Sequence, residues 1–333
     1  MDEAQADFAL NLIRTATTND ESVILSPFSI ALTLAMAYVG AEGKTKKQMA
    51  NVLSKGHSRQ QLNKYFSSFL VNVAKKKNKY ILNLANRLYI QQNFDLKLPY
   101  LNIIKSHYIG ELQQVNFTQE DAVEKTVAEI NKWVMQQTSD KIKNLVSQSD
   151  INSNTKLVEM MTVEGYFPYY EDDNIQVLGI PYSGDEIHLY IVLPQKQSGL
   201  LDIEKNLTGK RLLDYIQSCI ETQIQVEMPK FKIEKKVELV NSLKEMGMND
   251  AFTSAANFTG ITDLPLYINA VLHKSFIEVN EEGTEATSAS AIEMRLRSAP
   301  ITFAPIKLFH ADHPYLFAIT WQSTTILFIG RII

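Results

Sequence analysis

Cysteine is nearly absent from this sequence. Cys219 is the only one among 333 residues, so the chain can form no internal disulfide, which favours a reducing compartment. The stretch from Met1 to Asp7 is acidic and lacks the basic and apolar regions of a signal peptide. We therefore expect a cytoplasmic protein, with extracellular release by an unconventional route as the alternative.

Long apolar runs and an excess of positive charge are also missing. The longest apolar stretch, from Ile30 to Val39, is too short to cross a bilayer. The formal net charge is −4, and no basic patch is interleaved with aromatic residues, which argues against a nucleic-acid partner. We expect neither a membrane span nor binding to nucleic acid.

Motifs for catalysis and for metal or nucleotide binding are lacking as well. Gly43-Lys44-Thr45 resembles the end of a phosphate-binding loop, but Tyr38 stands where that loop needs a glycine. No Gly-x-Ser-x-Gly motif occurs. His310, Asp312 and His313 precede a proline without a further cluster of ligands, which predicts a local turn and no metal site. The sequence thus predicts neither an enzyme nor a cofactor.

The sequence does contain helical periodicity in its first half and strand-like alternation in its second. Helical patterns occur at 31–39, behind a cap-like Ser26, and at Val123, Val127, Ile130 and Val134. Strand patterns occur at 187–193, 224–228, 315–319 and 325–329, and one more short helix is expected at 243–248. This order predicts an α+β fold, and the absence of a linker indicates one domain over residues 1–333.

The segment from Glu281 to Ser298 is the most informative part of the chain. Gly283 gives the backbone freedom at its start. In an extended conformation one face would carry no charge, with Thr284, Ala286, Ser288, Ser290, Ile292 and Met294. The other face would carry all the charge, with Glu285, Thr287, Ala289, Ala291, Glu293 and Arg295. The residues alone leave two interpretations open, a flexible linker or a strand with one buried face.

Ten short motifs follow one another along the chain, at 26–30, 40–45, 85–89, 130–134, 229–232, 246–247, 273–274, 276–286, 311–317 and 326–331. Together and in this order they resemble the motifs of the serpin family. Each is weak alone, but their order over nearly the whole chain makes the resemblance specific. It implies a serpin fold, with a large mixed β-sheet, smaller additional sheets and a helical N-terminal half.

The resemblance also implies a mechanism. A serpin presents a reactive-centre loop, here about residues 281–300, which a protease cleaves to form an acyl-enzyme. The loop then inserts as a new strand into the large sheet and distorts the trapped protease. The family's spacing places the cut at Arg297-Ser298, with Arg295 as a second possible cut. An arginine before the cut suits a trypsin-like serine protease, with a cysteine protease as the other possible partner, and we expect a monomer.

The resemblance assigns two further groups of residues. The hinge of the loop comprises Glu281, Glu282, Gly283, Thr284, Glu285 and Ala286. A polar cluster beneath the sheet comprises the residues that match Ser26, Ser29 and His273. In the family this cluster also contains an asparagine from a central strand of the large sheet.

The chain departs from the family after Val158. Residues 154–158 match the start of that central strand, whereas Glu159-Met160-Met161 match a point well downstream. A block that holds the strand beside the insertion slot is therefore missing, and the polar cluster needs other partners, because unpaired buried polar groups are costly. A non-inhibitory serpin-like binding protein or an inactive isoform is accordingly the alternative function.

Overall fold

The first part of the chain is mainly helical. The computed structural model describes residues 1–18, 20–75, 87–108, 112–116, 120–142, 160–182, 184–280, 283–284 and 306–333. Its first helices are α1 (Asp2–Ala16), α2 (Pro27–Val39), α3 (Gly43–Ser54), α4 (Arg59–Lys75), α5 (Leu98–His107) and α6 (Glu120–Gln137). Three short strands lie between them: β1 (Val23–Leu25), β2 (Leu88–Gln91) and β3 (Leu112–Val115).

The second part is mainly strand. Its strands are β4 (Met160–Glu171), β5 (Ile175–Pro181), β6 (Ile187–Pro194), β7 (Ile220–Pro229), β8 (Phe231–Glu238), β9 (Leu272–Asn280), β10 (Gly283–Thr284), β11 (Lys307–His310), β12 (Tyr315–Trp321) and β13 (Thr325–Ile332). The helical elements are α7 (Leu200–Asn206), α8 (Gly209–Gln217), α9 (Val240–Glu245) and η1 (Asp250–Phe252). The predicted α+β class and the four predicted strand regions are confirmed.

One helix boundary differs from the prediction. The helix expected at 243–248 is α9, which ends at Glu245. Gly247 has a φ of 110°, a conformation that glycine adopts without a steric penalty and that cannot continue a right-handed helix. Met248 lies outside α9 but is fully buried. Its apolar side chain therefore reflects packing in the core and not a position in the helix.

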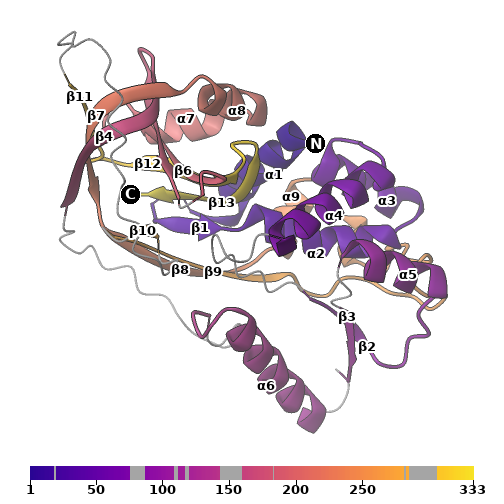
Figure 1. The fold of residues 1–333 in the computed structure, drawn as a ribbon. Coiled ribbons are helices and arrows are strands. Elements are labelled where there is room, and N and C mark those ends of the chain that lie inside the picture. Colours follow the sequence, from indigo (N-terminus) through magenta and orange to yellow (C-terminus); the bar gives the residue numbers. More distant parts are fainter. Residues whose placement is uncertain are drawn as a thin grey trace.

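The largest sheet has eight strands in the order β1-β13-β12-β6-β5-β4-β7-β11. The sheet is mixed, because β11 and β7 are parallel whereas all the other neighbouring strands of this sheet are antiparallel. Every residue of β12 is buried, and α2, which is apolar around almost its whole circumference, packs against β13. Figure 1 shows α7 and α8 above this sheet, α2 to α5 together at one end and α6 set apart below β8 and β9.

Two smaller sheets are separate from the eight-stranded one in their hydrogen bonding. Strands β10, β9 and β8 form an antiparallel sheet, and β2 and β3 form a parallel pair. Within the described part of the chain, no strand joins β2 to β9. The strand that leads into the predicted loop therefore belongs to a small sheet.

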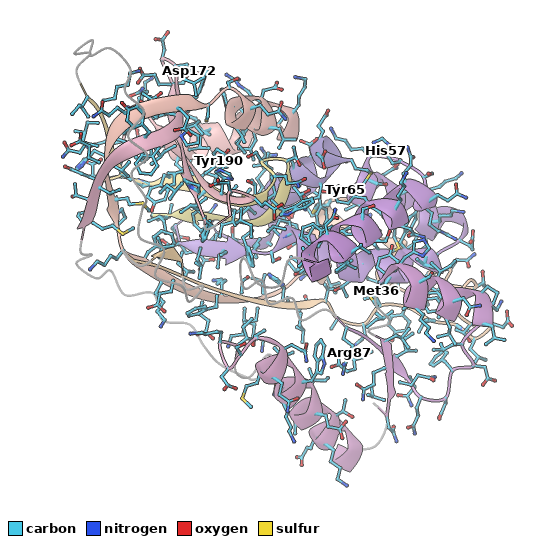
Figure 2. The ribbon with its side chains drawn as sticks, viewed as in Figure 1. Met36, His57, Tyr65, Arg87, Asp172 and Tyr190 are labelled. Atoms are coloured by element: carbon cyan, nitrogen blue, oxygen red, sulfur yellow. The ribbon has the colours of Figure 1, made fainter. Side chains whose placement is uncertain are left out.

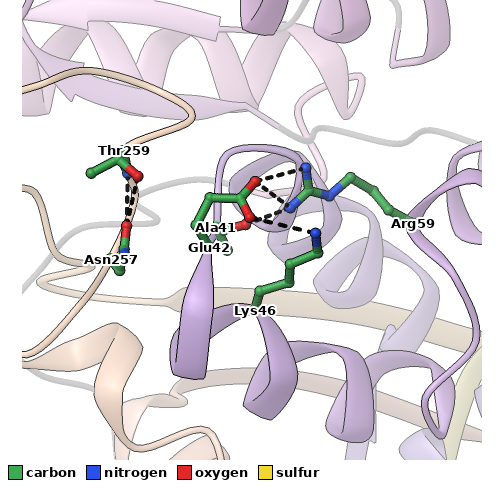
Figure 3. Close-up of polar contacts among 6 residues, drawn as sticks. All are labelled: Ala41, Glu42, Lys46, Arg59, Asn257 and Thr259. Carbon is green, nitrogen blue, oxygen red and sulfur yellow. Dashed lines mark hydrogen bonds and ion pairs between the residues drawn. The ribbon is translucent and has the colours of Figure 1, made fainter.

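The turn between α2 and α3 is fixed by a polar network around Glu42 (Figure 3). The Glu42 carboxylate accepts hydrogen bonds from Arg59 at 3.3 Å and pairs with Lys46 at 3.4 Å. The Arg59 guanidinium also donates to the Ala41 carbonyl. The Thr45 hydroxyl accepts from the backbone N–H of Asn257 at 2.9 Å. The segment that resembles a phosphate-binding loop is thus the first turn of α3, tied to a neighbouring loop.

A buried ion pair joins the last strand, β13, to the helix α7. The Arg331 side chain is fully buried, and its Nη1 lies 2.8 Å from Glu204 Oε2. Arg331 also donates to the Glu21 carbonyl at 3.1 Å and to the Thr17 hydroxyl at 2.9 Å. Burial raises the pKa of Glu204, and the charge of Arg331 opposes that rise.

Removal of one partner of this pair should be strongly destabilising. We expect Arg331→Met to lower the free energy of unfolding by about 3–5 kcal/mol, because it leaves the Glu204 carboxyl buried without its counter-ion. The double variant Arg331→Met/Glu204→Leu should recover most of that loss. Urea denaturation of the three proteins measures both effects, and equal losses in the single and double variants would contradict this account.

Candidate functional site

Strand β9 carries the chain into the predicted loop. Its last residues pair with β10, with Gly283 opposite Asn280 and Thr284 opposite Val279. The described part of the hinge therefore turns back along β9. The other predicted hinge residues (Glu281, Glu282, Glu285 and Ala286) lie outside the described residues, as do Arg295, Arg297 and Ser298.

The chain is described again from Ile306. Strand β11 forms the edge of the eight-stranded sheet, where Phe309 is fully buried. Lys307 pairs with Glu171, and His310 Nδ1 lies 2.6 Å from Glu227 Oε2. The two sides of the predicted loop are thus attached to two different sheets.

The turn after β11 contains the residues considered for metal binding. His313 Nδ1 lies 2.7 Å from Asp312 Oδ1, and His313 Nε2 lies 2.7 Å from the Pro194 carbonyl oxygen. Hydrogen bonding to His313 lowers the pKa of Asp312. The chain bends at His313, and the contact with Pro194 connects this segment to the end of β6. No group of three or more ligating side chains in the described ranges is arranged to hold a metal ion.

Other chemistry-bearing side chains are dispersed. Figure 2 shows His57 on the helical side of the molecule and Arg87 beside α6, well apart from each other. Burial raises the pKa of the Cys219 thiol to about 12, so the thiolate needed for nucleophilic chemistry is not formed at neutral pH. Among the described helices, none is both long and apolar enough to cross a membrane.

A cavity of about 1050 Å³ lies between β9 and β2. The helix α2 contributes to its lining from one side and α6 from another. Residues from these elements include Ile30, Leu34, Ala37, Leu88, Ile90, Val127, Ile130, Val134, Phe276 and Ile277. Up to Glu278, β9 has β8 on one side and no described strand on the other, and among the described strands β2 pairs only with β3. Such strand edges present backbone N–H and C=O groups that can bond an added strand.

The predicted polar cluster borders this cavity. The Ser26 backbone N–H donates to His273 Nε2 at 2.9 Å, and the Ser26 hydroxyl donates to the Leu327 carbonyl at 2.9 Å. Ser29 lines the cavity and directs its backbone N–H at the Ser26 hydroxyl at 3.4 Å. The three predicted residues are therefore close together. Of Ser26 and Ser29, only Ser26 is hydrogen-bonded to the His273 ring.

Sequence reasoning missed Ser275, which completes the cluster. Its hydroxyl is 2.9 Å from His273 Nε2 and donates to the Ile24 carbonyl at 3.0 Å. Ser275 lies two residues after His273 on the same strand, and residues two apart share one face of a strand. That spacing could have indicated that Ser275 and His273 lie side by side. In this chain Ser275 is one of the partners of His273.

The His273 ring is neutral at physiological pH. Burial lowers its pKa to about 4, because a charged imidazolium is poorly solvated in an apolar surrounding. The contact with Ser26 agrees with this, since Nε2 accepts a hydrogen bond from the Ser26 N–H and therefore does not itself carry a proton.

A second contact missed at the sequence level holds α6 against β2. The Arg87 guanidinium lies 3.9 Å from the centroid of the Trp133 ring, and its Nη1 donates to Gln113 Oε1 at 2.8 Å. The one arginine thus connects β2, β3 and α6. Both residues belong to the motifs that suggested the family, but their spacing of 46 positions gives no sign that they stack.

The comparisons with known proteins now decide the family. A family model described as "Serpin (serine protease inhibitor)" matches residues 3–158 and 153–333. The chain belongs to the serpin family. The two matched ranges meet at 153–158, which is where the sequence analysis placed the missing block.

Individual serpins match the chain over almost its whole length. Serpin B6 of Pongo abelii is 35% identical over 373 aligned positions, covering 99% of this chain and 98% of that protein. Leukocyte elastase inhibitor of Xenopus laevis is 32% identical, with 99% and 98% covered. The solved structure of tengpin, a thermophilic serpin in the native state, has a TM-score of 0.84 and 27% identity, with 99% of this chain and 93% of tengpin covered.

These matches confirm two predictions. The chain has the serpin fold, and serpins are protease inhibitors rather than enzymes. The alignment with Serpin B6 spans 373 positions, whereas this chain has 333 residues. The chain therefore carries gaps relative to that serpin, as a missing block requires.

The low pKa of His273 predicts a pH dependence of stability. Below pH 6.5 the unfolded chain protonates this ring, whereas the folded chain does so only near pH 4. Stability should therefore fall as the pH drops from 6.5 to 4, by up to about 2 kcal/mol between pH 7 and pH 5. His273→Asn, which keeps an acceptor for the Ser26 N–H, should lack this loss in denaturant titrations. The same pH dependence in both proteins would refute it.

Proposed function

We propose that this serpin is a suicide-substrate inhibitor of trypsin-like serine proteases, with Arg297-Ser298 as its bait bond. The observation that carries the proposal is the position of the cavity. It lies along the open edge of β9, the strand whose C-terminal end continues into the loop. A loop cut at its far end could fold back at Gly283 and pair with β9 in this space.

The chemistry begins with the bait bond. The serine hydroxyl of the protease attacks the carbonyl carbon of Arg297, the amine of Ser298 leaves, and an ester joins Arg297 to the protease. The arginine side chain fits a specificity pocket that carries an acidic residue. Arg295 is the second possible site, and a cysteine protease would form the corresponding thioester.

The next step is insertion of the cleaved loop. The exposed N–H and C=O groups along β9 would gain partners in the new strand. Thr284, Ala286 and Ser288 lie on the face that must be buried, and none carries a charge that would need a partner there. Gly283 supplies the freedom to turn at the hinge.

The proposal includes three statements about the whole protein. Residues 1–333 act as one domain, which is supported by a single cluster of buried residues that extends from Ala6 to Ile329. The protein is a monomer, and it acts in the cytoplasm, where a single cysteine remains reduced.

One observation favours the second candidate, a non-inhibitory serpin-like binding protein or inactive isoform. The sheet of β8 and β9 and the sheet of β2 and β3 are separate. A strand added to β9 would then have a partner on one side only, unless β2 moved toward it. The protease could in that case cut the loop and leave before insertion distorts its active site.

A trapping experiment separates the two candidates. With equimolar trypsin we expect a covalent conjugate that survives denaturing electrophoresis, because the ester outlasts unfolding of both proteins. Arg297→Ala should abolish the conjugate, whereas the matched variant Arg295→Ala should retain it. Cleavage of the loop by trypsin that stays fully active would favour the non-inhibitory candidate. A conjugate with papain and none with trypsin would favour a cysteine protease as the target.

Heat stability after cleavage tests insertion itself. We expect the cleaved protein to unfold about 10 °C or more above the uncleaved one, since a new strand adds several kcal/mol to a protein of this size. Thr284→Arg places a charge on the inserting face and should remove this gain. Glu285→Arg, on the opposite face, should keep it. No rise in the cleaved wild-type protein would rule out insertion.

A further inference from the structure

The first part of β4 has a neighbouring strand on one side only. Strand β4 pairs with β7 over residues 160–169 but with β5 only over residues 169–171. At residues 160–168, which we call the β4 edge, no described strand therefore lies on the side away from β7. The backbone N–H and C=O groups on that side can bond an added strand.

The inward face of the β4 edge is incompletely covered. Residues an even number of positions apart share one face of a strand, so Val163 lies on the same face as Phe167 and Tyr169, which are both buried. The partner of Val163 on β7 is Val226, which is also buried, whereas Val163 is 37% exposed. An apolar side chain on an added strand would cover Val163.

The outward face of the β4 edge carries an unbalanced negative charge. Glu164 lies on this face, two residues before Tyr166, which is 68% exposed. The Gln223 side chain donates to Glu164 Oε1 at 3.2 Å, but an amide carries no charge. In the described part of the chain no cation forms an ion pair with Glu164, and Lys307 of β11 is paired with Glu171 instead.

The neighbouring strand adds further acidic groups to the same face. Directly paired residues of two strands lie on one face of a sheet. Thr162 is paired with Glu227 and Pro168 with Glu221 on β7. Glu227 is bonded to His310, whereas Glu221 is exposed. The outward face beside the β4 edge therefore favours a cationic neighbour over an anionic one.

The β4 edge is separate from the cavity beside β9. Figure 1 shows β4, β7 and β11 together at one end of the molecule, away from α2 to α5. No residue of β4 belongs to the described lining of the cavity. A ligand at the β4 edge would therefore not compete with the predicted loop for that cavity.

From this arrangement we propose that the β4 edge binds an extended segment of a partner protein, which adds to the sheet as a strand beside β4. The segment has apolar residues on its inward face and a lysine or arginine on its outward face. An apolar side chain covers Val163, and the cation lies opposite Glu164. Backbone hydrogen bonds supply the affinity, and the alternating side chains supply the specificity.

Charge disfavours a second copy of this chain as the occupant. A two-fold pairing centred on the β4 edge sets Glu164 opposite Glu164 of the other copy. Like charges directly opposite each other destabilise a strand pair, whereas opposite charges stabilise it. The same carboxylate that attracts a basic segment therefore opposes pairing of β4 with itself.

A labelled peptide allows a direct binding test. The sequence Ser-Thr-Val-Lys-Val-Thr-Ser reads the same in both directions, so it presents the same side chains to a parallel and an antiparallel neighbour. With its lysine opposite Glu164, its two valines lie on the inward face, opposite Val163 and Gly165. The fluorescence anisotropy of this peptide is measured as the full chain is added, and a peptide with glutamate in place of lysine is measured in parallel.

We expect saturable binding of the lysine peptide, with the glutamate peptide about fivefold weaker. Glu164→Lys should reverse this preference, so that the glutamate peptide binds more tightly than the lysine peptide. Asp173→Lys is the matched control, because it makes the same change of charge at an exposed position in the turn between β4 and β5. It should keep the preference of the wild-type protein.

Backbone methylation distinguishes strand addition from attraction between charges alone. Successive N–H groups of a strand point to opposite sides, so only one alternate set of the peptide's N–H groups can bond β4. Two lysine peptides are therefore prepared, each N-methylated on one alternate set. One should lose saturable binding and the other should retain it.

Three results would overturn the proposal. The first is equal binding of the two methylated peptides. The second is a preference for the lysine peptide that Glu164→Lys leaves unchanged, in a protein whose circular dichroism matches that of the wild type. The third is no saturable binding of the lysine peptide, which would mean that another part of this chain or a second copy already covers the edge.

Discussion

The open edge of β9 is the constraint on which the rest of this structure depends. A strand edge in the interior of a protein presents backbone groups that must be bonded by another strand, by side chains or by water. Here the edge faces a large apolar cavity, and the separate β2–β3 pair lies across it. The described edge of β9 therefore borders this cavity up to Glu278, immediately before the segment predicted to be the reactive-centre loop.

The polar cluster of Ser26, His273 and Ser275 is hydrogen-bonded although the block after Val158 is missing. In the serpins it resembles, an asparagine from the absent strand joins the cluster around the histidine that matches His273. In this chain Ser275, the Ser26 backbone and the Ile24 and Leu327 carbonyls supply the bonds. The cluster thus keeps a neutral His273 whose Nε2 is hydrogen-bonded, and the Ser26 and Ser275 hydroxyls both donate to backbone carbonyls. These hydrogen bonds stabilise the fold locally, even though β9 and β2 belong to separate sheets.

Much of the fold followed from local patterns. Alternation at 224–228 predicted a strand because period-two burial is a local property of the backbone. The short apolar runs at 315–319 and 325–329 predicted strands that are buried on both faces, as they are. The end of α9 was missed, because Met248 is apolar for reasons of core packing and Gly247 ends the helix. In the site, Ser26 and His273 came from a family motif, whereas Ser275 and the Arg87–Trp133 stack required coordinates, since such contacts depend on how distant segments are brought together.

The sequence by itself determined the family, the α+β class and the position of the missing block. These are properties of residue order, and a motif or a gap can be recognised without knowing where it lies in space. Only the tertiary structure decided that β9 belongs to a small sheet, that a cavity separates it from β2, and that cations alone supply the charge of the cavity's described lining. The reason is physical: a cavity and its charge are sums over walls contributed by β2, α2, α6 and β9, and no local pattern records how four distant segments converge.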